Sequence, residues 1–419
     1  MKPEPFSFRL TAADVKYELI NLKQLVFEVT DACNLCCKYC IYGELYSGFD
    51  QRNSLFLPFK TAKAVIDYLA DIWNANSGSA SKSPLTISFY GGEPLMNFPL
   101  IQNIVDYILS LRLPKVISFS MTTNCVLLAS HMDYLVDYDF NLLCSLDGDY
   151  SSNAHRVYHD GRPSYDRVFN NLKILQAKHP LYFAKHVQFN AVLHNLNNVP
   201  GIIAFFKKEF GKTPTISELS DVGVREDKKS DFITTFRSMS YDLARANNTT
   251  ALLKELNYDA PETNDLMFFL STALGNYFET YADLLSPEAE SPLIPSGTCL
   301  PFSKKMFIKV DGKILPCERI HHHFFFGTAN NETVNLDLQA AAEKFNTYLD
   351  KLQPRCSVCA SMNHCSKCFY SIEGIDSEST VCESFVIKSK LKQQEEYYKR
   401  YLFLHPSLYK EFIEATIIN

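Results

Sequence analysis

Short apolar runs alternate with amphipathic segments along the first half of the chain. The runs are bounded by polar or turn-forming residues, which is typical of buried strands, and the segments between them place apolar residues at helical spacing. The predicted strands are Gln24–Val29, Leu85–Tyr90, Lys115–Met121, Phe140–Ser145, His186–Leu193 and Thr215–Glu218. The predicted helices are Phe59–Trp73, Pro99–Leu111, Ser130–Val136, Ser164–His179 and Asn198–Phe210. Strands that alternate with helices predict βαβ units and a parallel sheet.

Other segments interrupt or follow this pattern. Residues 1–22 form an extension with room for one small helix, and Asn74–Pro84 is polar and predicts a flexible surface loop. Residues 221–298 carry leucines and aromatic residues at helical spacing without strand-like runs, so we expect a helical connector. Residues 386–419 contain most of a charged amphipathic segment, Glu383–Arg400, that predicts a C-terminal helix.

Composition narrows the class of protein. The chain has 419 residues, of which 46% are hydrophobic and 21% charged, as expected for a globular protein of two or three domains. A formal charge of −6 gives no reason to expect nucleic acid or an anionic membrane as a partner. No segment approaches the roughly 18 apolar residues of a membrane span, so we expect a cytoplasmic protein. In that reducing compartment, 13 cysteines favour metal or cluster binding over disulfides.

Three of these cysteines stand close together after the first predicted strand. Cys33, Cys37 and Cys40 have the spacing C-x3-C-x2-C, and their thiolates can hold three irons of one [4Fe–4S] cube. The fourth iron is then free to bind a substrate or cofactor. Cys36 is an extra thiol that this pattern does not use. The alternative is a structural zinc site, although the stretch contains no fourth ligand.

The C-x3-C-x2-C loop resembles the signature of the radical S-adenosylmethionine (SAM) superfamily. The resemblance implies that the open iron chelates SAM and that an electron from the cluster cleaves it to a 5′-deoxyadenosyl radical. It places Tyr39, the residue before the third cysteine, near the adenine. It also implies a partial (β/α)6 TIM-like barrel, here residues 23–220. The six predicted strands agree with a partial barrel, since a complete TIM barrel has eight.

A second motif follows the second predicted strand. Tyr90-Gly-Gly-Glu-Pro resembles the GGEP motif of the superfamily. Gly91 and Gly92 would let the backbone approach a ligand closely, and the resemblance implies that Glu93 accepts hydrogen bonds from the SAM ammonium group. The alternative for such a tetrapeptide is an ordinary turn.

Further polar residues stand at the ends of the later strands, where a barrel places its functional groups. The resemblance implies contacts to SAM by Thr122, Asn124, Ser145, Arg156, Asn190 and Leu193. Ser145 and Arg156 are expected at the SAM carboxylate. Two departures stand out: Cys125 replaces the usual glycine after Asn124, and the gap from Gly148 to Arg156 is one residue short. The alternative for Thr122 and Asn190 is a capping or turn role.

Seven cysteines occupy the last third of the chain: Cys299, Cys317, Cys356, Cys359, Cys365, Cys368 and Cys382. Gly312 is predicted at a turn between the strand-like runs Lys305–Val310 and Lys313–Pro316. Together with the cysteines, this pattern makes residues 299–385 resemble a SPASM domain, which carries two auxiliary [4Fe–4S] clusters. The resemblance assigns the outer cluster to Cys356, Cys359, Cys365 and Cys382, and the inner one to Cys299, Cys317 and Cys368. The spacing between Cys365 and Cys368 is one residue shorter than in the family. A zinc ribbon is the alternative.

The inner auxiliary cluster lacks one ligand in this assignment. Sulfatase maturases of the family supply another cysteine shortly before Cys299, but none lies between Cys144 and Cys299. The iron is either open, ready for a substrate thiolate, or held by one of His321, His322 and His323. We interpret the histidines as a solvated loop and favour the open site. Glu318 follows Cys317, where the resemblance implies a general base.

These patterns predict a radical SAM enzyme that installs a thioether or carbon–carbon cross-link in a ribosomally made precursor peptide. Its expected cofactors are SAM and three [4Fe–4S] clusters, and its expected electron donor is a flavodoxin or ferredoxin. Only 32 residues precede Cys33, so we expect no leader-binding domain there and possible use of a separate recognition protein. One alternative is an anaerobic sulfatase maturase that forms formylglycine. A non-catalytic iron–sulfur sensor is the other, but it needs no SAM pocket.

Overall fold

The computed structural model describes residues 8–50, 52–80, 83–256, 266, 296–362, 365, 367–377, 380–404, 406 and 410. The chain divides into two compact units. The barrel unit comprises Ala12–Ala246 and Leu300–Ala341, and the cysteine-rich unit comprises Met1–Thr11, Asn247–Cys299 and Ala342–Asn419. Residues 257–265 and 267–295, which hold much of the expected helical connector, lie outside the described part.

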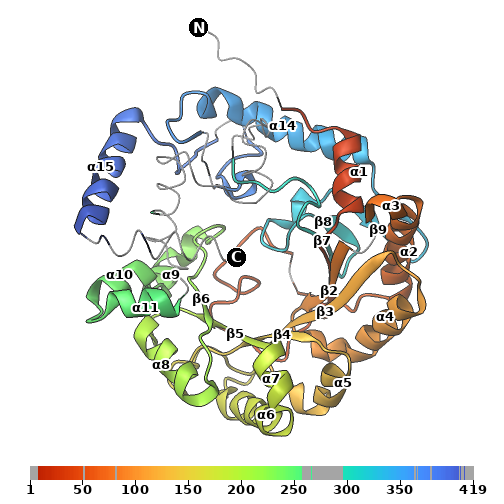
Figure 1. The fold of residues 1–419 in the computed structure, drawn as a ribbon, viewed down its shortest axis with the longest axis horizontal. Coiled ribbons are helices and arrows are strands. Elements are labelled where there is room, and N and C mark those ends of the chain that lie inside the picture. The colour runs from red at the N-terminus through yellow and green to blue at the C-terminus, as the bar shows by residue number, and fades with distance from the viewer. Residues whose placement is uncertain are drawn as a thin grey trace. The chain divides into compact units, whose positions relative to one another are not determined.

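One ten-stranded sheet organises the barrel unit (Figure 1). Its strands are β1 (Gln24–Thr30), β2 (Ser83–Gly91), β3 (Lys115–Thr123), β4 (Asn141–Ser145), β5 (Val187–Val192), β6 (Thr215–Ser217), β7 (Lys305–Ile308), β8 (Lys313–Leu315), β9 (Gly327–Ala329) and β10 (Val334–Asn335). Their order is β10-β9-β8-β7-β1-β2-β3-β4-β5-β6. Strands β1 to β6 pair in parallel, as do β7 and β1, whereas β7 to β10 pair antiparallel. This confirms the predicted α/β fold, a partial TIM-like barrel.

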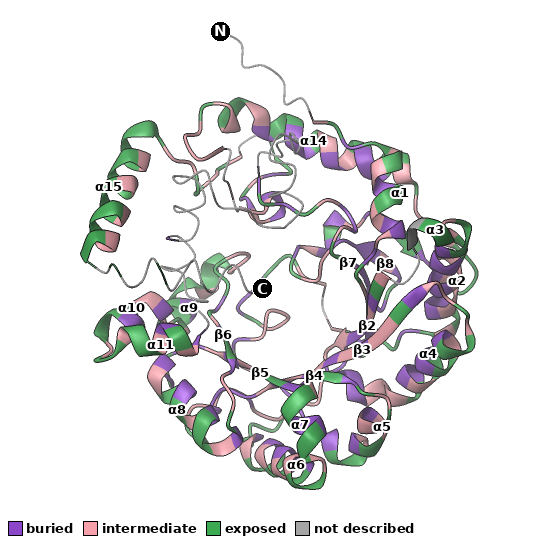
Figure 2. Ribbon diagram, in the orientation of Figure 1, coloured by how far each residue is buried: buried purple, intermediate pink, exposed green. Residues whose placement is uncertain are grey.

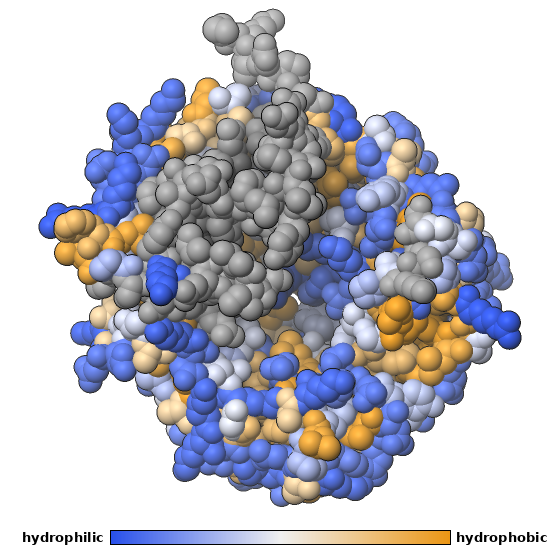
Figure 3. Space-filling view, viewed as in Figure 1, coloured by the Kyte–Doolittle hydropathy of each residue, from blue (hydrophilic) through white to orange (hydrophobic). Residues whose placement is uncertain are grey.

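Helices cover the outer face of this sheet (Figure 1). They are α1 (Ala12–Ile20), α2 (Phe59–Ala75), α4 (Phe98–Ser110), α5 (Met132–Asp137), α6 (Tyr165–Lys178), α7 (Pro180–His186) and α8 (Val199–Phe210). Short helices α9 (Lys229–Thr235) and α10 (Met239–Arg245) follow β6. The buried sides of the outer helices face the strands, and the opposite sides are exposed and largely hydrophilic (Figures 2 and 3). This division is the amphipathic pattern of the sequence realised in space.

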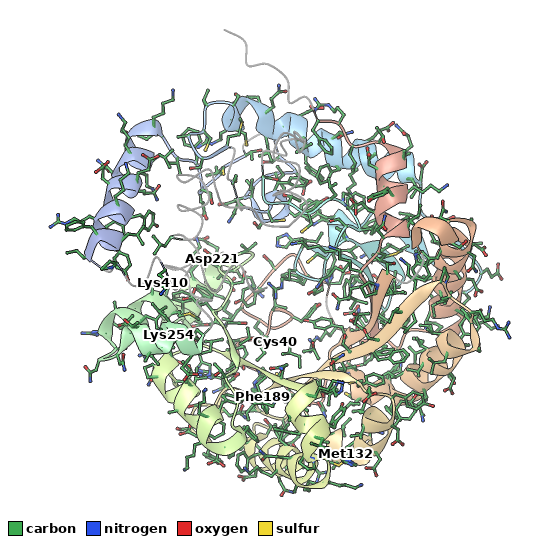
Figure 4. All side chains as sticks on the ribbon, in the orientation of Figure 1. Cys40, Met132, Phe189, Asp221, Lys254 and Lys410 are labelled. Carbon is green, nitrogen blue, oxygen red and sulfur yellow. The ribbon has the colours of Figure 1, made fainter. Side chains whose placement is uncertain are left out.

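The two faces of the sheet differ in chemistry. On the helix side, Phe189 of β5 packs against Phe183 of α7 and against Phe206 and Phe210 of α8, with ring centroids 4.8 to 6.1 Å apart. On the inner side, hydrogen bonds connect Gln24 to Ser88 and Ser88 to Ser120, each 2.6 Å long. Cys40 lies on this inner side, whereas Met132 lies outside on α5 (Figure 4). The barrel therefore presents polar groups to its interior.

Several elements differ from the sequence predictions. The expected loop Asn74–Pro84 is shorter, because α2 runs to Ala75, a single-turn helix α3 occupies Ser77–Ala80, and β2 starts at Ser83, where it pairs with Lys115 of β3. The sequence analysis did not predict α7, which begins at Pro180, because proline ends one helix but is also well suited to the first turn of the next.

Three further elements complete the described fold. In the cysteine-rich unit these are α11 (Thr249–Glu255) and α15 (Lys388–Leu404), and α14 (Leu338–Cys356) connects the units along the chain. Helix α14 was not predicted, whereas α15 corresponds to the predicted C-terminal helix. Among the described residues, no helix combines the length and apolar character needed to cross a bilayer.

Candidate active site at the cysteine loop

The cysteine loop begins directly after β1 and is held against the end of β2. The backbone N–H of Gly92 donates to Thr30 O and that of Glu93 to Ala32 O, both at 2.9 Å. A Cβ atom at Gly91 would lie 2.0 Å from Thr30 O, and one at Gly92 would lie 2.0 Å from Ala32 O. The two glycines are therefore needed for contact with the protein's own backbone, and not only for approach to a ligand as the sequence analysis expected.

The three motif thiols share one half-buried environment, whereas Cys36 is exposed. Burial raises the pKa of Cys33 and raises that of Cys37 to about 12, and the neighbouring thiols add to both effects. In the described part of the chain, no three His, Cys, Asp or Glu side chains converge on a single-ion site. Three mutually close thiols of this kind fit a multi-iron cluster, because iron binding removes their protons and neutralises their charge.

Glu93 is fully buried beside this loop. Its Oε1 accepts hydrogen bonds from Thr123 Oγ1 at 2.8 Å and Leu95 N at 3.1 Å, and its Oε2 accepts one from Asn124 N at 2.7 Å. Burial raises its pKa to about 7, although these hydrogen bonds oppose the shift. A carboxyl group with this pKa is partly protonated near neutral pH, and a nearby cation such as an ammonium group would favour its ionised form.

Asn124 connects the end of β3 to the cysteine loop. Its Nδ2 donates to Asn34 Oδ1 at 2.7 Å, and its Oδ1 accepts from Val126 N at 3.0 Å. The Nδ2 of Asn34 is buried without a hydrogen-bond partner among the described residues. A buried donor without a partner beside Cys33 indicates room for an acceptor that a polar ligand can supply.

A buried charged network lies behind the loop. Asp147 Oδ1 accepts hydrogen bonds from Arg156 Nη2 and from Val192 N, both at 3.0 Å. The other oxygen, Oδ2, accepts a hydrogen bond from the hydroxyl group of Tyr39. The ring of Tyr39 also stacks on His194 with centroids 5.6 Å apart. Although burial opposes ionisation, Arg156 and His194 lower the pKa of Asp147 to about 2.

Two of the residues that the resemblance assigns to SAM belong to this network: Tyr39, expected near the adenine, and Arg156, expected at the SAM carboxylate. In the structure both are buried, and the Arg156 guanidinium is already paired with Asp147. The physical reason is that a buried arginine needs an anionic partner, and Asp147 supplies it within the protein.

The remaining predicted SAM contacts lie on β3 to β5. Ser145 of β4 is in register with Asn190 of β5, and both are partly exposed. The Oδ1 of Asn190 accepts from Ser217 Oγ at 2.8 Å, and Thr122 of β3 is also partly exposed. Leu193 is 0% exposed and belongs to the hydrophobic core.

Glu318 lies on the barrel side of the β7–β8 hairpin. Its Oε1 pairs with Lys305 Nζ at 2.9 Å, and its Oε2 is 3.8 Å from Cys317 Sγ. Tyr90, at the end of β2, connects this carboxylate to the cysteine loop. Besides burial, which is the main cause, Glu318 and Cys40 both raise the pKa of the Tyr90 hydroxyl. Glu318 and Cys40 therefore both lie within electrostatic range of the Tyr90 hydroxyl.

The cysteine-rich unit brings four thiols together. Besides burial, the thiols of Cys365, Cys382 and Cys359 raise the pKa of Cys356, which reaches about 12. These are the four cysteines that the sequence assigned to an outer cluster. In the same unit Cys368 is affected by Cys299, which places two of the three expected inner ligands near each other.

The histidine triplet is not the solvated loop expected from the sequence. His322 is only 1% exposed, and its Nδ1 accepts a hydrogen bond from Asp50 N at 3.0 Å. His321 packs against Phe49 with ring centroids 5.4 Å apart, and His323 is exposed. The aromatic residues around the triplet explain the difference, because they bury the imidazole of His322 in the barrel unit.

Comparison with known proteins identifies the core of the chain. Residues 27–187 match the Radical SAM superfamily. The chain contains a radical SAM domain. Over 158 residues it is 33% identical to an uncharacterized protein of Methanocaldococcus jannaschii, covering 38% of this chain and 50% of that protein. Over 224 residues it is 25% identical to the radical SAM cyclopropyl synthase TigE of Paramaledivibacter caminithermalis, covering 52% of this chain and 44% of TigE.

These curated relatives are matched over about half of their length or less. The fold of the radical SAM chain also resembles that of native anSMEcpe with bound AdoMet and the Cp18Cys peptide. The TM-score is 0.59 at 17% identity, covering 95% of this chain and 99% of that one. This likeness concerns the fold and extends beyond the radical SAM domain.

The segment that matches the Radical SAM superfamily, residues 27–187, contains both the cysteine loop and Glu93. Cys33, Cys37 and Cys40 would hold the cluster, and the buried Glu93 is the group suited to an ammonium. The sequence analysis assigned no role to Asp147, His194 or Arg52, although all three surround the loop. Asp147 stood within the quoted Ser-Leu-Asp-Gly run, but nothing in the sequence showed its pairing with Arg156.

Proposed function

We propose that this radical SAM enzyme modifies a peptide side chain and closes a thioether or carbon–carbon bond there. The observation that carries the proposal is the shared position of Cys40 and Glu318 around Tyr90. Both the proposed cluster loop and a carboxylate act on this one hydroxyl. We propose that a substrate carbon placed near Tyr90 loses a hydrogen atom to the radical and a proton to Glu318.

The chain supplies groups for each product of this chemistry. When bound, SAM and the reduced cluster supply a carbon radical that takes one hydrogen atom from the substrate. Closing a bond at that carbon then removes one more electron and one proton from the peptide. Glu318 can take the proton, since its carboxylate is an acceptor held in place by Lys305 at 2.9 Å. Lys305 keeps the carboxylate oriented through the same ion pair.

The electron needs an acceptor, and the cysteine-rich unit provides ligands for one. We propose that residues 299–385 form a SPASM domain, in which Cys356, Cys359, Cys365 and Cys382 hold one auxiliary [4Fe–4S] cluster. Cys299, Cys317 and Cys368 would hold a second cluster with an open iron. Cys359 and Cys365 both raise the pKa values of Cys356 and Cys382, after burial as the main cause, which supports a common role for the four thiols. A low-potential protein such as a flavodoxin or ferredoxin would return electrons to the loop cluster.

The comparisons support a peptide or protein substrate without deciding the bond. TigE is named a cyclopropyl synthase, and a cyclopropyl ring contains carbon–carbon bonds. The peptide in the anSMEcpe structure favours a second candidate, a sulfatase maturase that makes formylglycine. Glu318 in place of Asp and the missing eighth cysteine favour the first.

Mass spectrometry of treated peptides tests the proposal. The enzyme, reconstituted anaerobically, is incubated with SAM, dithionite and short cysteine- or glycine-rich peptides encoded beside its gene. We expect 5′-deoxyadenosine and a peptide that has lost two hydrogen atoms. A peptide aldehyde that reacts with a hydrazine would instead support the sulfatase-maturase alternative. Unmodified peptides combined with no 5′-deoxyadenosine from an iron-loaded enzyme would refute the catalytic proposal.

A further inference from the structure

A short segment after the cysteine loop holds Arg52 beside the cluster site. The carboxylate of Asp31 accepts hydrogen bonds from Asn53 N at 2.8 Å and from Leu55 N at 2.6 Å. Thr30 Oγ1 also donates to Leu55 O at 2.6 Å. These bonds fix the segment against Thr30 and Asp31, which directly precede the cysteine loop. The hydrogen bonds of the residues that follow Arg52 therefore fix its backbone position next to the loop.

The guanidinium of Arg52 lies beside the cysteine loop. Its Cζ lies 4.5 Å above the centre of the ring of Tyr42, which stands two residues after Cys40. Burial disfavours its charge, but Cys40 and Cys33 raise the pKa of Arg52. The guanidinium therefore lies within electrostatic range of both sulfurs.

Arg52 differs from Arg156 in one decisive respect. Arg156 pairs with the carboxylate of Asp147 at 3.0 Å, so its charge is balanced within the protein. Within the described ranges, no Asp or Glu forms a salt bridge with Arg52, which is only partly exposed. A half-buried guanidinium without a carboxylate is stable when another anion balances it. The anions at hand are the thiolates of the cysteine loop.

We propose that Arg52 is the counter-cation of the cysteine loop and sets the potential at which its cluster accepts an electron. A cube held by three thiolates carries net negative charge, and reduction adds one more negative charge. A nearby fixed cation stabilises the reduced form, since net charge and hydrogen bonds to sulfur tune cluster potentials. Stacking on Tyr42 keeps the guanidinium in place. This role rests on the radical SAM domain and is independent of the substrate.

A redox titration of the loaded enzyme, followed by electron paramagnetic resonance, tests this role. The loop cluster is recognised as the signal that changes when SAM is added. We expect Arg52→Gln to shift its midpoint potential to a more negative value and Arg52→Lys to stay close to the wild type. Signals that do not respond to SAM serve as an internal reference and should keep their potentials. An unchanged potential in a fully loaded Arg52→Gln enzyme would overturn the proposal.

A matched control and a loading assay make the result decisive. Arg112 is exposed between α4 and β3, where β3 begins, whereas the cysteine loop follows the end of β1. Arg112→Gln therefore removes the same charge at the other end of the strands, and we expect it to leave the potential unchanged. If Arg52→Gln holds no loop cluster, Arg52→Lys decides. A lysine variant that loads fully at a wild-type potential supports the charge role. A lysine variant that loads as poorly as the glutamine variant contradicts it, because the loop would then need the shape of arginine.

Discussion

The two groups of cysteines are held in different ways. In the barrel unit, the loop is bonded to a neighbouring segment: Cys36 N donates to Val157 O at 2.7 Å and Lys38 N to His155 O at 3.1 Å. Gly92 and Glu93 fix its start, and a buried ion pair of Asp147 and Arg156 lies behind it. Backbone contacts to other segments of the barrel unit thus hold this loop.

Within the described part of the cysteine-rich unit, the four thiols are linked mainly by hydrogen bonds within and between their own segments. Among the described residues, backbone hydrogen bonds within this group include Cys359 N to Cys356 O at 3.0 Å and Ala360 N to Val386 O at 2.8 Å. The guanidinium of Arg355 is a cation that favours the thiolates of Cys356 and Cys382. We infer from this comparison that the barrel loop is pre-organised for a cluster, whereas the second group depends more on a bound metal for its shape.

Replacing the two sets of ligands separately should give the largest effect. We expect Cys33, Cys37 and Cys40 changed together to Ala to abolish SAM cleavage while iron falls from about twelve to about eight per chain. Changing Cys356, Cys359, Cys365 and Cys382 to Ala should lower the iron by the same amount but leave uncoupled SAM cleavage. Iron analysis and 5′-deoxyadenosine assays measure both. Equal loss of SAM cleavage in the two variants would remove the distinction between the sites.

Iron removal should reveal which loop depends on metal. Metal binding supplies on the order of 10 kcal/mol of folding free energy in small metal-stapled sites. After anaerobic chelation, we expect the amides of residues 356–362 to lose protection from hydrogen exchange completely. Strands β1 to β3 should keep theirs, because the sheet and its helices hold them. The hydrogen exchange of loaded and chelated protein, compared by mass spectrometry, checks this. Equal loss in both regions would show that the barrel loop is not pre-organised.

The sequence predicted the elements whose position follows from the periodicity of apolar residues alone. The period of apolar residues placed β1 and α2 within a few residues, since burial of one face dictates both elements. It missed α7 and α14, and it could not show that β7 extends the barrel sheet beside β1. That pairing joins residues about 280 positions apart, so no local pattern reports it.

The candidate site was predictable in its ligands but not in its partners. The spacing of the cysteines and the run Gly91-Gly92-Glu93 identified the loop and its neighbour. The pairing of Arg156 with Asp147, and the isolation of Arg52 from carboxylates, depend on side-chain directions in three dimensions. The sequence offered three arginines near the motifs, at positions 52, 156 and 162, without a means to tell which one is already neutralised.

Removing the buried counter-ion should destabilise the barrel unit. In Asp147→Asn, the Arg156 guanidinium would remain buried without an anion, which costs about 3–5 kcal/mol. Anaerobic urea unfolding followed by circular dichroism measures this loss. The exposed pair of Asp160 with Arg162 provides the control, and Asp160→Asn should show no measurable change. An Asp147→Asn enzyme as stable as the wild type would mean that the network does not support the loop.

The smallest expected effect is a pH dependence of SAM binding. Because burial raises the pKa of Glu93 to about 7, its carboxyl group is protonated below that pH in the free enzyme. This raised pKa stabilises the fold at acidic pH, and the contribution is lost as pH rises from about 4.5 through 7. An ammonium group of SAM favours the ionised form, so binding releases a proton below pH 7 and affinity rises with pH until the carboxylate is ionised.

Equilibrium dialysis of SAM against the loaded enzyme between pH 6 and 8 measures this dependence. We expect affinity to rise by no more than about tenfold per pH unit below pH 7 and then to level off, as one coupled proton requires. Glu93→Gln cannot ionise, so its profile should lack this rise. It also replaces one carboxylate oxygen by an NH2 group, so either Asn124 N or Leu95 N loses its buried acceptor, which weakens binding at every pH. A wild-type profile in the variant would show that another group responds to SAM. The pre-organised loop would then recognise its ligand without Glu93.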